Sequence, residues 1–378
     1  SMAGARPRVK GAVPPVPEGP RVVVAAGGTA GHVVPAMAVA AALRESGAEV
    51  SFLGTRDKME AELVPASGYE IDFLRVRGID RRNPLRAARA GFEAIGAVGA
   101  ARSALRRRRA DVVMGGGGYV AGPAGLAATL TRTPLVLTEA DSHLGLANRL
   151  LAGRARRVCL AFPIEGRTGD KYVVTGRPVA EAVLAADRGK ARARFRIDAD
   201  ERVLLVVGGS QGARSVNFAA VEAFAERNGR DFRVLHLSGT RDYAALRERL
   251  DAAPYKERYE LIEYEPDLGD VLAASDLILG RSGGSIFEFT AAGRPAVLVP
   301  FPYATADHQR ANARWMERAG AAEIVEDDAL DPAALLARVK EILGDPARLD
   351  KMASAARGLA KPDAARTIAD QVLEAAAR

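Results

Sequence analysis

The sequence contains one cysteine and four histidines, and neither set supports a disulfide framework or a metal site. Cys159 alone forms no intrachain disulfide and no cysteine-based zinc site, which fits a reducing compartment. His32, His143, His236 and His308 show no metal-ligand spacing, and no Asp-x-Asp motif lies beside the glycine loops described below. We therefore expect no metal and no cofactor.

Aromatic residues and long apolar runs are also scarce. Aromatic residues make up 5% of the chain and are not interleaved with the arginines, which argues against a nucleic-acid-binding protein. No apolar run approaches the roughly 18 to 20 residues that a membrane-spanning helix needs. Hydrophobic residues still make up 48% of the chain, so a sizeable buried core is expected and general disorder is excluded.

The 378 residues exceed one ordinary domain and suit two domains of about 150 to 200 residues each. Residues 1–20 begin with Ser1-Met2, which resembles a tag-cleavage scar, and are rich in proline and glycine, so we expect a disordered tail. After it, short β-branched runs that end in glycine-rich turns alternate with Ala- and Leu-rich helical patterns. The expected strands are 21–26, 50–53, 111–114, 134–137 and 157–160, followed by 203–207, 233–237, 276–279 and 296–299.

This alternation predicts an α/β fold with two Rossmann-like, doubly wound parallel-sheet domains that face each other across a cleft. The turn-rich segment 162–170 is the expected linker. The first domain then covers 21–164 and the second covers 165–349, and we assign the C-terminal helix 350–378 to the first domain. Ligands of such sheets bind beyond the carboxyl ends of the strands.

The formal net charge of +7 arises in the first half of the chain. Residues 75–109 carry eleven arginines against Asp80 and Glu93, a basic surface that suits anionic lipid, nucleic acid or a phosphorylated substrate. Asn83-Pro84 is a good helix start, and apolar residues recur after it at helical spacings. Such a helix lies on anionic lipid, or packs on the sheet with a solvated basic face, and periodicity alone favours the second. On the first of these alternatives, which the resemblance given below favours, the residues at the membrane are Leu85, Arg86, Arg89, Phe92, Ile95, Arg106, Arg107, Arg108 and Arg109.

Four glycine-rich loops follow expected strands, and we number them as the first loop (27–31), the second (208–212), the third (281–285) and the fourth (115–118). Glycines let the backbone approach a ligand closely, and a following helix presents unpaired N–H groups to an anion. Behind the third loop, Glu288 is placed to accept hydrogen bonds from a ribose diol, which suggests a nucleotide. The plainer alternatives are tight strand-to-helix turns and a glutamate that only complements a helix dipole.

Several segments together resemble the MurG family of glycosyltransferases over residues 21 to about 370. They are GGTAGHVVPAMAVA at 27–40, GGYVAGPAGLAA at 117–128, GGSQGARSVN at 208–217, RSGGSIFEFTAAGRPAVLVPFP at 281–302 and ADHQRANA at 306–313. The resemblance implies a GT-B fold, an inverting mechanism without a bridging metal, and peripheral attachment to the cytoplasmic face of the cell membrane. It also implies transfer of N-acetylglucosamine from UDP-GlcNAc to the muramyl 4-hydroxyl of undecaprenyl-pyrophosphoryl-muramyl-pentapeptide. The first domain then binds acceptor and membrane, and the second binds the donor.

Site roles follow from the resemblance position by position. It implies catalytic roles for His32 and Glu139, and from the residues alone Asp141 is a further candidate base. His32 at a predicted helix start is held neutral by the helix dipole, as a base requires. The implied donor-binding residues are Thr29, Ala30, Gly31, Asp141, Arg177, Ser210, Gln211, Gly212, Arg281, Ser282, Gly283, Gly284, Ser285, Glu288, Gln309 and Asn312. The implied acceptor-binding residues are Gly28, Gly118, Tyr119 and Asn148.

The chain also departs from the family pattern. Where the family reads His-Glu-Gln-Asn, residues 138–141 read Thr-Glu-Ala-Asp, and Ala180 stands where a donor-side arginine is expected, with Arg177 as a possible substitute. The 281–288 loop is one residue shorter than usual, and His143 lies on a loop that usually lacks a histidine. These changes keep two alternatives open, a GT-B transferase with another UDP-sugar or acceptor, and a UDP-sugar 2-epimerase.

Overall fold

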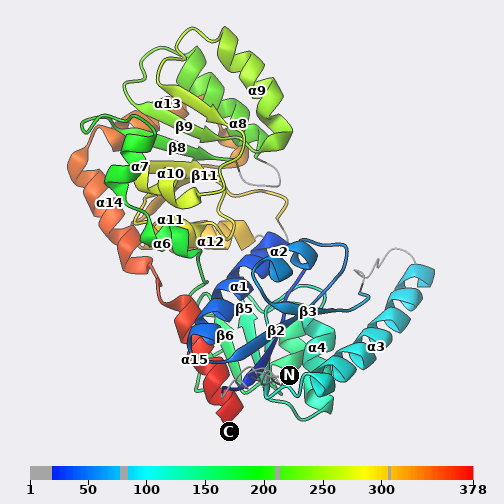
Figure 1. Ribbon diagram of the computed structural model, residues 1–378. Coiled ribbons are helices and arrows are strands. Elements are labelled where there is room, and N and C mark those ends of the chain that lie inside the picture. Colours follow the sequence, from blue (N-terminus) through cyan, green and yellow to red (C-terminus); the bar gives the residue numbers. More distant parts are fainter. Residues whose placement is uncertain (1–18, 77–83, 209–212, 305–307, 378) are drawn as a thin grey trace, which may run out of the picture.

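The computed structural model describes residues 19–76, 84–208, 213–304 and 308–377, and for 84–91 it describes the backbone alone. Within these ranges the chain forms two α/β domains, each a parallel sheet with helices on both faces (Figure 1). The expected α/β fold class with two doubly wound sheets is confirmed. The part of the expected tail at 1–18 lies outside the described residues.

The first sheet has the strand order β3-β2-β1-β4-β5-β6-β7. Its strands are β1 (Arg21–Ala25), β2 (Glu49–Gly54), β3 (Glu70–Phe73), β4 (Val112–Gly115), β5 (Leu135–Glu139), β6 (Arg157–Leu160) and β7 (Tyr172–Val174). Its helices are α1 (Ala30–Glu45), α2 (Glu60–Ala66), α3 (Pro84–Arg107), α4 (Ala121–Leu130) and α5 (Leu146–Leu151). Central strands such as β1 and β4 are buried on both faces, which explains their unbroken Val-rich sequences.

The second sheet repeats this order as β10-β9-β8-β11-β12-β13. Its strands are β8 (Val203–Val207), β9 (Arg233–Leu237), β10 (Tyr259–Ile262), β11 (Leu277–Gly280), β12 (Ala296–Leu298) and β13 (Ala322–Ile324). The helical segments that follow β7 are α6 (Glu181–Ala185), α7 (Arg188–Arg194), α8 (Arg214–Val221), η1 (Glu222–Glu226), α9 (Thr240–Ala252), α10 (Leu268–Ala274), α11 (Ile286–Ala291), α12 (His308–Arg318), η3 (Asp327–Ala329), α13 (Pro332–Leu343), α14 (Pro346–Leu359) and α15 (Ala364–Ala377). Two apolar cores, one on each face, hold this sheet between its helices.

The chain crosses between the domains twice. Strand β7 still pairs with β6, so the first crossing comes after Val174 and not at the turn-rich segment 162–170, which is the loop between those two strands. The second crossing separates α14, whose Leu349 packs in the core of the second domain, from α15, whose Val372 is fully buried on the first sheet. Helix α15 lies beside α1 (Figure 1).

The two crossings touch each other. Gly176 in the first crossing has a φ of +76°, and a Cβ at this position would lie 2.4 Å from Cβ of Lys361 in the second. Both the conformation and the close approach require glycine here. The two connections between the domains therefore pass through one tight contact directly behind the cleft.

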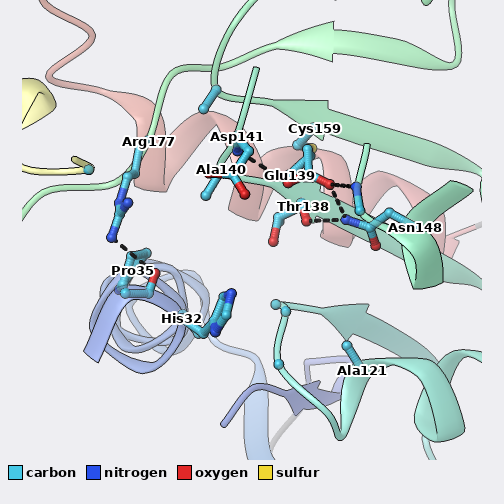
Figure 2. A pocket seen from close by; sticks show the side chains of 18 of the residues that line it. His32, Pro35, Ala121, Thr138, Glu139, Ala140, Asp141, Asn148, Cys159 and Arg177 are labelled. Carbon is cyan, nitrogen blue, oxygen red and sulfur yellow. Dashed lines mark hydrogen bonds between the residues drawn. The ribbon is translucent and has the colours of Figure 1, made fainter. Parts of the chain in front are cut away.

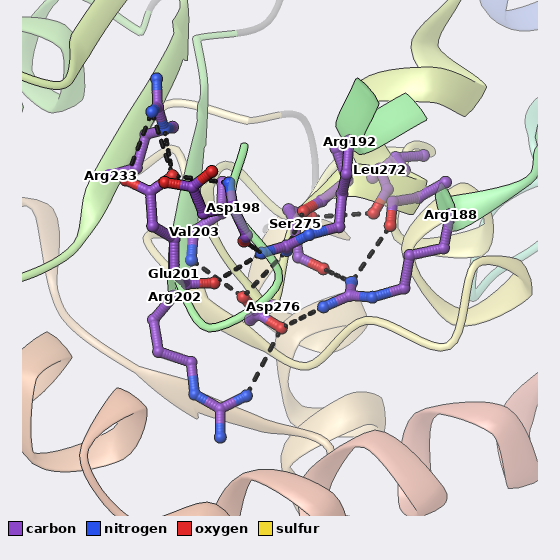
Figure 3. A network of polar contacts seen from close by, with 12 residues as sticks. Arg188, Arg192, Asp198, Glu201, Arg202, Val203, Arg233, Leu272, Ser275 and Asp276 are labelled. Carbon is purple, nitrogen blue, oxygen red and sulfur yellow. Dashed lines mark hydrogen bonds and ion pairs between the residues drawn. The ribbon is translucent and has the colours of Figure 1, made fainter. Parts of the chain in front are cut away.

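At the opposite end of the second sheet, a carboxylate surrounded by arginines joins three elements (Figure 3). Asp276 accepts hydrogen bonds from the Val203 amide at 2.8 Å and from Arg188 at 2.7 Å. Arg192 donates to the carbonyls of Ala274, Asp198 and Glu201 at 3.0, 2.7 and 2.7 Å. The network ties α7 to the starts of β8 and β11, and so fixes this helix to the sheet.

Helix α3 buries small side chains and only part of the apolar stripe expected from its sequence. Ala101 and Ala104 are buried together with Leu105 in the core that α3 shares with α4. In contrast, Phe92 and Ile95 are 78% and 71% exposed. The expected stripe therefore divides, because its C-terminal part packs on the domain and its middle part faces solvent.

The arginines at the end of α3 divide in the same way. Arg107 and Arg108 form ion pairs with Asp72 of β3 at 2.9 Å, and Arg108 also pairs with Glu70. Arg106 and Arg109 are exposed. Half of this basic group therefore attaches α3 to the edge of the sheet, and half faces solvent. The side chains of Leu85, Arg86 and Arg89 lie outside the described residues.

Candidate active site

A cleft of about 370 Å³ opens between the domains at the carboxyl ends of the strands. In both sheets the winding direction reverses next to the first strand, between β1 and β4 and between β8 and β11. The described glycine loops that follow β1, β4 and β11 therefore lie at the reversal points, where ligands of open α/β sheets bind. The cleft lining includes Gly31 and His32, Gly116–Gly118, Thr138–Asp141, Gly145–Asn148, Gly176–Pro178, Gly284, His308 and Asn312.

The first glycine loop is held by a carboxylate that sequence reasoning missed. Glu60 is fully buried and accepts hydrogen bonds from the Gly28 amide at 3.2 Å and from the amide and hydroxyl of Thr55 at 2.9 and 2.7 Å. The Glu60 carboxylate therefore takes up the Gly28 N–H, which was expected from the sequence to contact the acceptor substrate. The available signal was an acidic residue soon after the strand β2, since strand ends carry site residues in this fold.

His32 lies in the first turn of α1 and faces Thr138, Glu139 and Asn148 across the cleft (Figure 2). Its Nδ1 lies 3.2 Å from the Thr29 hydroxyl. Burial lowers the pKa of His32 from its ordinary value of 6.5, the nearby Arg177 lowers it further, and Asp141 opposes them. The imidazole is therefore neutral near neutral pH, and the tautomer with the proton on Nδ1 leaves Nε2 able to accept a proton.

Glu139 organises the loop between β5 and α5. Its carboxylate accepts hydrogen bonds from the amides of Asp141 and Gly145 at 3.1 and 2.8 Å and from the Asn148 side chain at 2.9 Å. Burial raises the pKa of Glu139 despite these three donors. Asn148 also donates to the Thr138 carbonyl at 2.9 Å. Two residues expected to contact substrate thus also hold the loop that presents Asp141 to the cleft.

The third glycine loop brings Glu288 and Arg177 together. Glu288 lies in the first turn of α11, and burial raises its pKa to about 7 while the charge of Arg177 opposes the rise. Arg177 comes from the first crossing; burial lowers its pKa from the ordinary value, and the charges of Glu288 and Asp141 oppose that shift. Glu288, Arg177 and Asp141 are therefore electrostatic neighbours at the junction of the two domains.

Helix α12 closes this side of the cleft. The Asn312 side chain donates to the Ser282 carbonyl at 2.9 Å, and the Ser282 hydroxyl donates to the Gln309 carbonyl at 2.6 Å. The Gln309 side chain is engaged too, since it accepts from the Phe301 amide at 2.9 Å. Asn312 is 3% exposed and lines the cleft, and among the residues that the structure describes its Oδ1 has no hydrogen-bond partner. A buried acceptor without a partner points to a ligand hydroxyl or N–H that completes it.

Arg281 sits in a network behind the third loop. It is 8% exposed and pairs with Asp327 at 2.5 Å, while a second nitrogen donates to the Ser215 hydroxyl at 3.0 Å. The expected donor-side arginine thus also fastens α8 to η3. The next residues of the loop, at 283–285, are half-buried and leave part of its backbone accessible. This accessible stretch includes Gly283, Gly284 and Ser285, as the donor role expected for them requires.

The remaining expected residues are dispersed. Ser210, Gln211 and Gly212 lie outside the described residues. Tyr119 is 60% exposed beside the fourth loop, where Gly118 packs against the Gly27 backbone. Thr29 and Ala30 are exposed at the start of α1, and His143 is exposed on the loop after β5.

The two halves of the chain match the two parts of one enzyme family. Residues 22–160 match the glycosyltransferase family 28 N-terminal domain, and residues 203–368 match the family 28 C-terminal domain. The crystal structure of MurG from Acinetobacter baumannii superposes with a TM-score of 0.78 and 31% sequence identity, over 94% of this chain and 99% of that one. The chain belongs to the MurG family of glycosyltransferases.

Curated MurG relatives match over nearly their whole length. The proteins of Moorella thermoacetica and Salinibacter ruber are 40% and 41% identical, over 94% and 95% of this chain and 98% of each relative. Both are named UDP-N-acetylglucosamine–N-acetylmuramyl-(pentapeptide) pyrophosphoryl-undecaprenol N-acetylglucosamine transferase. The family membership and the glycosyltransferase activity expected from the sequence are confirmed.

The fold is shared more widely than the family. UDP-GlcNAc 2-epimerase from Neisseria meningitidis bound to UDP-GlcNAc superposes with a TM-score of 0.67 at 16% identity, over 94% of this chain and all of that one. At this identity the likeness concerns the fold alone. The MurG assignment therefore depends on the relatives and on the residues of the cleft.

We predict that His32→Gln lowers kcat by about 10² to 10⁴ and leaves UDP affinity nearly unchanged, since it removes a proton acceptor and no donor contact. In the wild type, kcat/KM should fall with acid only below pH 6.5, because burial and Arg177 hold the pKa of His32 below that value. The variant should lose this limb. His143→Gln on the exposed loop is the matched control. Abolished turnover in Asp141→Asn together with near-normal turnover in His32→Gln would make Asp141 the base.

Proposed function

We propose that this protein transfers N-acetylglucosamine from UDP-GlcNAc to the 4-hydroxyl of a lipid-linked muramyl-pentapeptide, with inversion at the anomeric carbon. The observation that carries the proposal is that a neutral histidine of the first domain lines one cleft together with Arg177, whose charge also acts on the half-buried Glu288 of the second domain. The product is the lipid-linked disaccharide of peptidoglycan synthesis. The relatives' names support the choice of substrates, and the geometry of the cleft supports the roles proposed below.

The donor binds on the loops of the second domain. Glu288 accepts hydrogen bonds from the ribose hydroxyls, and the loop 282–285 with Arg177 meets the diphosphate. Asn312 and Gln309 lie on the sugar side, where the unpartnered Asn312 Oδ1 accepts from a hydroxyl or the acetamido N–H. The positive charge of Arg177 stabilises the departing UDP, whose negative charge grows in the transition state.

The acceptor binds on the loops of the first domain, with Gly118, Tyr119 and Asn148 around it. His32 Nε2 takes the proton of the acceptor hydroxyl as the oxygen attacks the anomeric carbon from the face opposite UDP. Asp141 stabilises the positive charge that develops at that carbon, as carboxylates do in glycoside hydrolysis. The Thr29 hydroxyl accepts from Nδ1–H and so keeps Nε2 free for the transfer.

The experiment that tests the function measures UDP release with purified protein, a panel of UDP-sugars and a lipid-linked muramyl-pentapeptide, in the presence of EDTA. We expect release only with acceptor present, and the highest kcat/KM for UDP-GlcNAc. The disaccharide product is identified by mass spectrometry. Conversion of UDP-GlcNAc without acceptor would instead indicate a 2-epimerase, and preference for another UDP-sugar would overturn the donor assignment.

A membrane surface is the proposed second partner, on the cytoplasmic face. In the described part of the chain no helix is long and apolar enough to cross a bilayer. Helix α4 packs between α3 and α5, and all three expose apolar side chains. These are Phe92, Ile95, Leu126, Leu130, Leu146 and Leu150. Next to them a groove lined by Arg106, Arg109 and Arg132 supplies positive charge for anionic headgroups.

We predict that Phe92→Ser with Ile95→Ser reduces co-sedimentation with vesicles that contain phosphatidylglycerol, because the apolar contact is lost. Arg106→Gln with Arg109→Gln should reduce it too, and chiefly at low salt. Turnover of a soluble acceptor analogue should not change. The matched control is Leu184→Ser, an exposed leucine of the second domain. Vesicle binding by all variants at the level of the wild type would contradict the proposal.

A further inference from the structure

One arginine contacts the loops of both domains. Nη2 of Arg177 donates a hydrogen bond to the Gly31 carbonyl at 3.0 Å, in the turn that carries His32. On its other side the guanidinium covers Gly284, where a Cβ would lie only 1.8 Å from Nη1. The side chain therefore spans from the first glycine loop to the third, and Figure 2 shows it at the edge of the cleft above Pro35.

The Gly31 carbonyl is available to Arg177 because of a proline inside α1. In a regular helix this carbonyl would accept from the amide four residues later, but position 35 is proline and has no N–H. The sequence thus leaves one carbonyl of the helix without its usual partner, beside the crossing that carries Arg177. Sequence reasoning missed this, although a proline four residues after Gly31 was the signal.

The charges around Arg177 connect the same two loops. It faces Glu288 of the second domain and Asp141 of the first. His32 in turn faces Arg177 from the crossing and Asp141 from the β5–α5 loop, while Glu139 and the α12 residue His308 also line the cleft. A change of charge at Arg177 therefore alters the pKa of His32 in the first domain and that of Glu288 in the second.

We propose that Arg177 is a positioning residue shared by the two substrate sites: through the carbonyl that Pro35 leaves free it fixes the turn carrying His32, and over Gly284 it meets the donor diphosphate. This inference rests on the proposed function, since it takes a nucleoside diphosphate as the donor. The diphosphate, once bound, offsets the arginine charge that His32 faces, so the base strengthens when the donor is present. Donor binding and acceptor activation are then linked reciprocally.

A double-mutant cycle with Pro35→Ala and Arg177→Gln tests the contact. Pro35→Ala restores an amide that competes with Arg177 for the Gly31 carbonyl. We expect it to lower kcat/KM for the acceptor by about threefold to tenfold in the wild type, and to have little further effect when Arg177 is already glutamine. Circular dichroism and the melting temperature establish that each variant is folded. Equal losses in both backgrounds would mean that Pro35 acts on helix geometry alone, and would overturn the inference.

The pH dependence of kcat/KM distinguishes the proposed role from a purely structural one, because a purely structural role of Arg177 would leave the acidic limb at the same pH. Arg177→Gln removes a charge that lowers the pKa of His32, so the acidic limb of kcat/KM should shift to higher pH. Arg177→Lys should keep the limb near its wild-type position but lose part of the acceptor effect, because an ammonium lacks the planar fork that spans both loops. An unmoved limb in Arg177→Gln would contradict the shared role.

The matched control for charge is Arg149→Gln, an exposed arginine on α5. Calorimetry with UDP-GlcNAc on the wild type distinguishes a failure of the proposed function from a failure of the role proposed for Arg177. Absence of donor binding would overturn the proposed function itself. Donor binding together with an additive cycle would overturn only the role of Arg177.

Discussion

Every functional feature of this molecule depends on where the two sheets reverse their winding. Helices that follow β1 and β4 run back on opposite faces, and the same holds for β8 and β11, so a crevice opens at the carboxyl ends of these strands. Glycine is needed there because the backbone turns tightly and comes close to whatever binds. With two sheets of the same order facing each other, the two crevices form one cleft.

At that cleft and directly behind its third glycine loop, burial shifts the pKa values of two ionisable groups, His32 and Glu288, in opposite directions. It lowers the pKa of His32 and raises that of Glu288 to about 7, so both shifts favour a neutral form. The charge of Arg177 adds to the first shift and opposes the second. A single cation therefore favours a neutral imidazole as proton acceptor and an ionised carboxylate as hydrogen-bond acceptor at the same pH.

Sequence periodicity predicted the centre of each sheet and failed at the edges. All nine expected strands form, and the four that were missed, β3, β7, β10 and β13, are the outermost strands of the two sheets. An edge strand is partly exposed, so its sequence mixes polar and apolar residues, as in Glu70–Phe73, and lacks the unbroken apolar run of a central strand. Missing β7 also displaced the expected domain boundary.

The sequence predicted site residues that belong to local motifs. It did not predict those whose role depends on contacts between residues far apart in the chain. His32, Glu139 and Asn312 were expected and line the cleft. Glu60 was missed because its partner Gly28 lies far away in the sequence, and the contact of Arg177 with Gly31 joins residues that only the crossing brings together.

The central claim is that loops of both domains form one binding cleft for the donor and acceptor. Hydrogen–deuterium exchange with and without UDP-GlcNAc tests it most directly, because each amide reports separately. The account predicts slower exchange in the second domain at 282–289 together with slower exchange at 30–33 and 175–177, on the other side of the cleft. Protection confined to the second domain, or absent altogether, would contradict it.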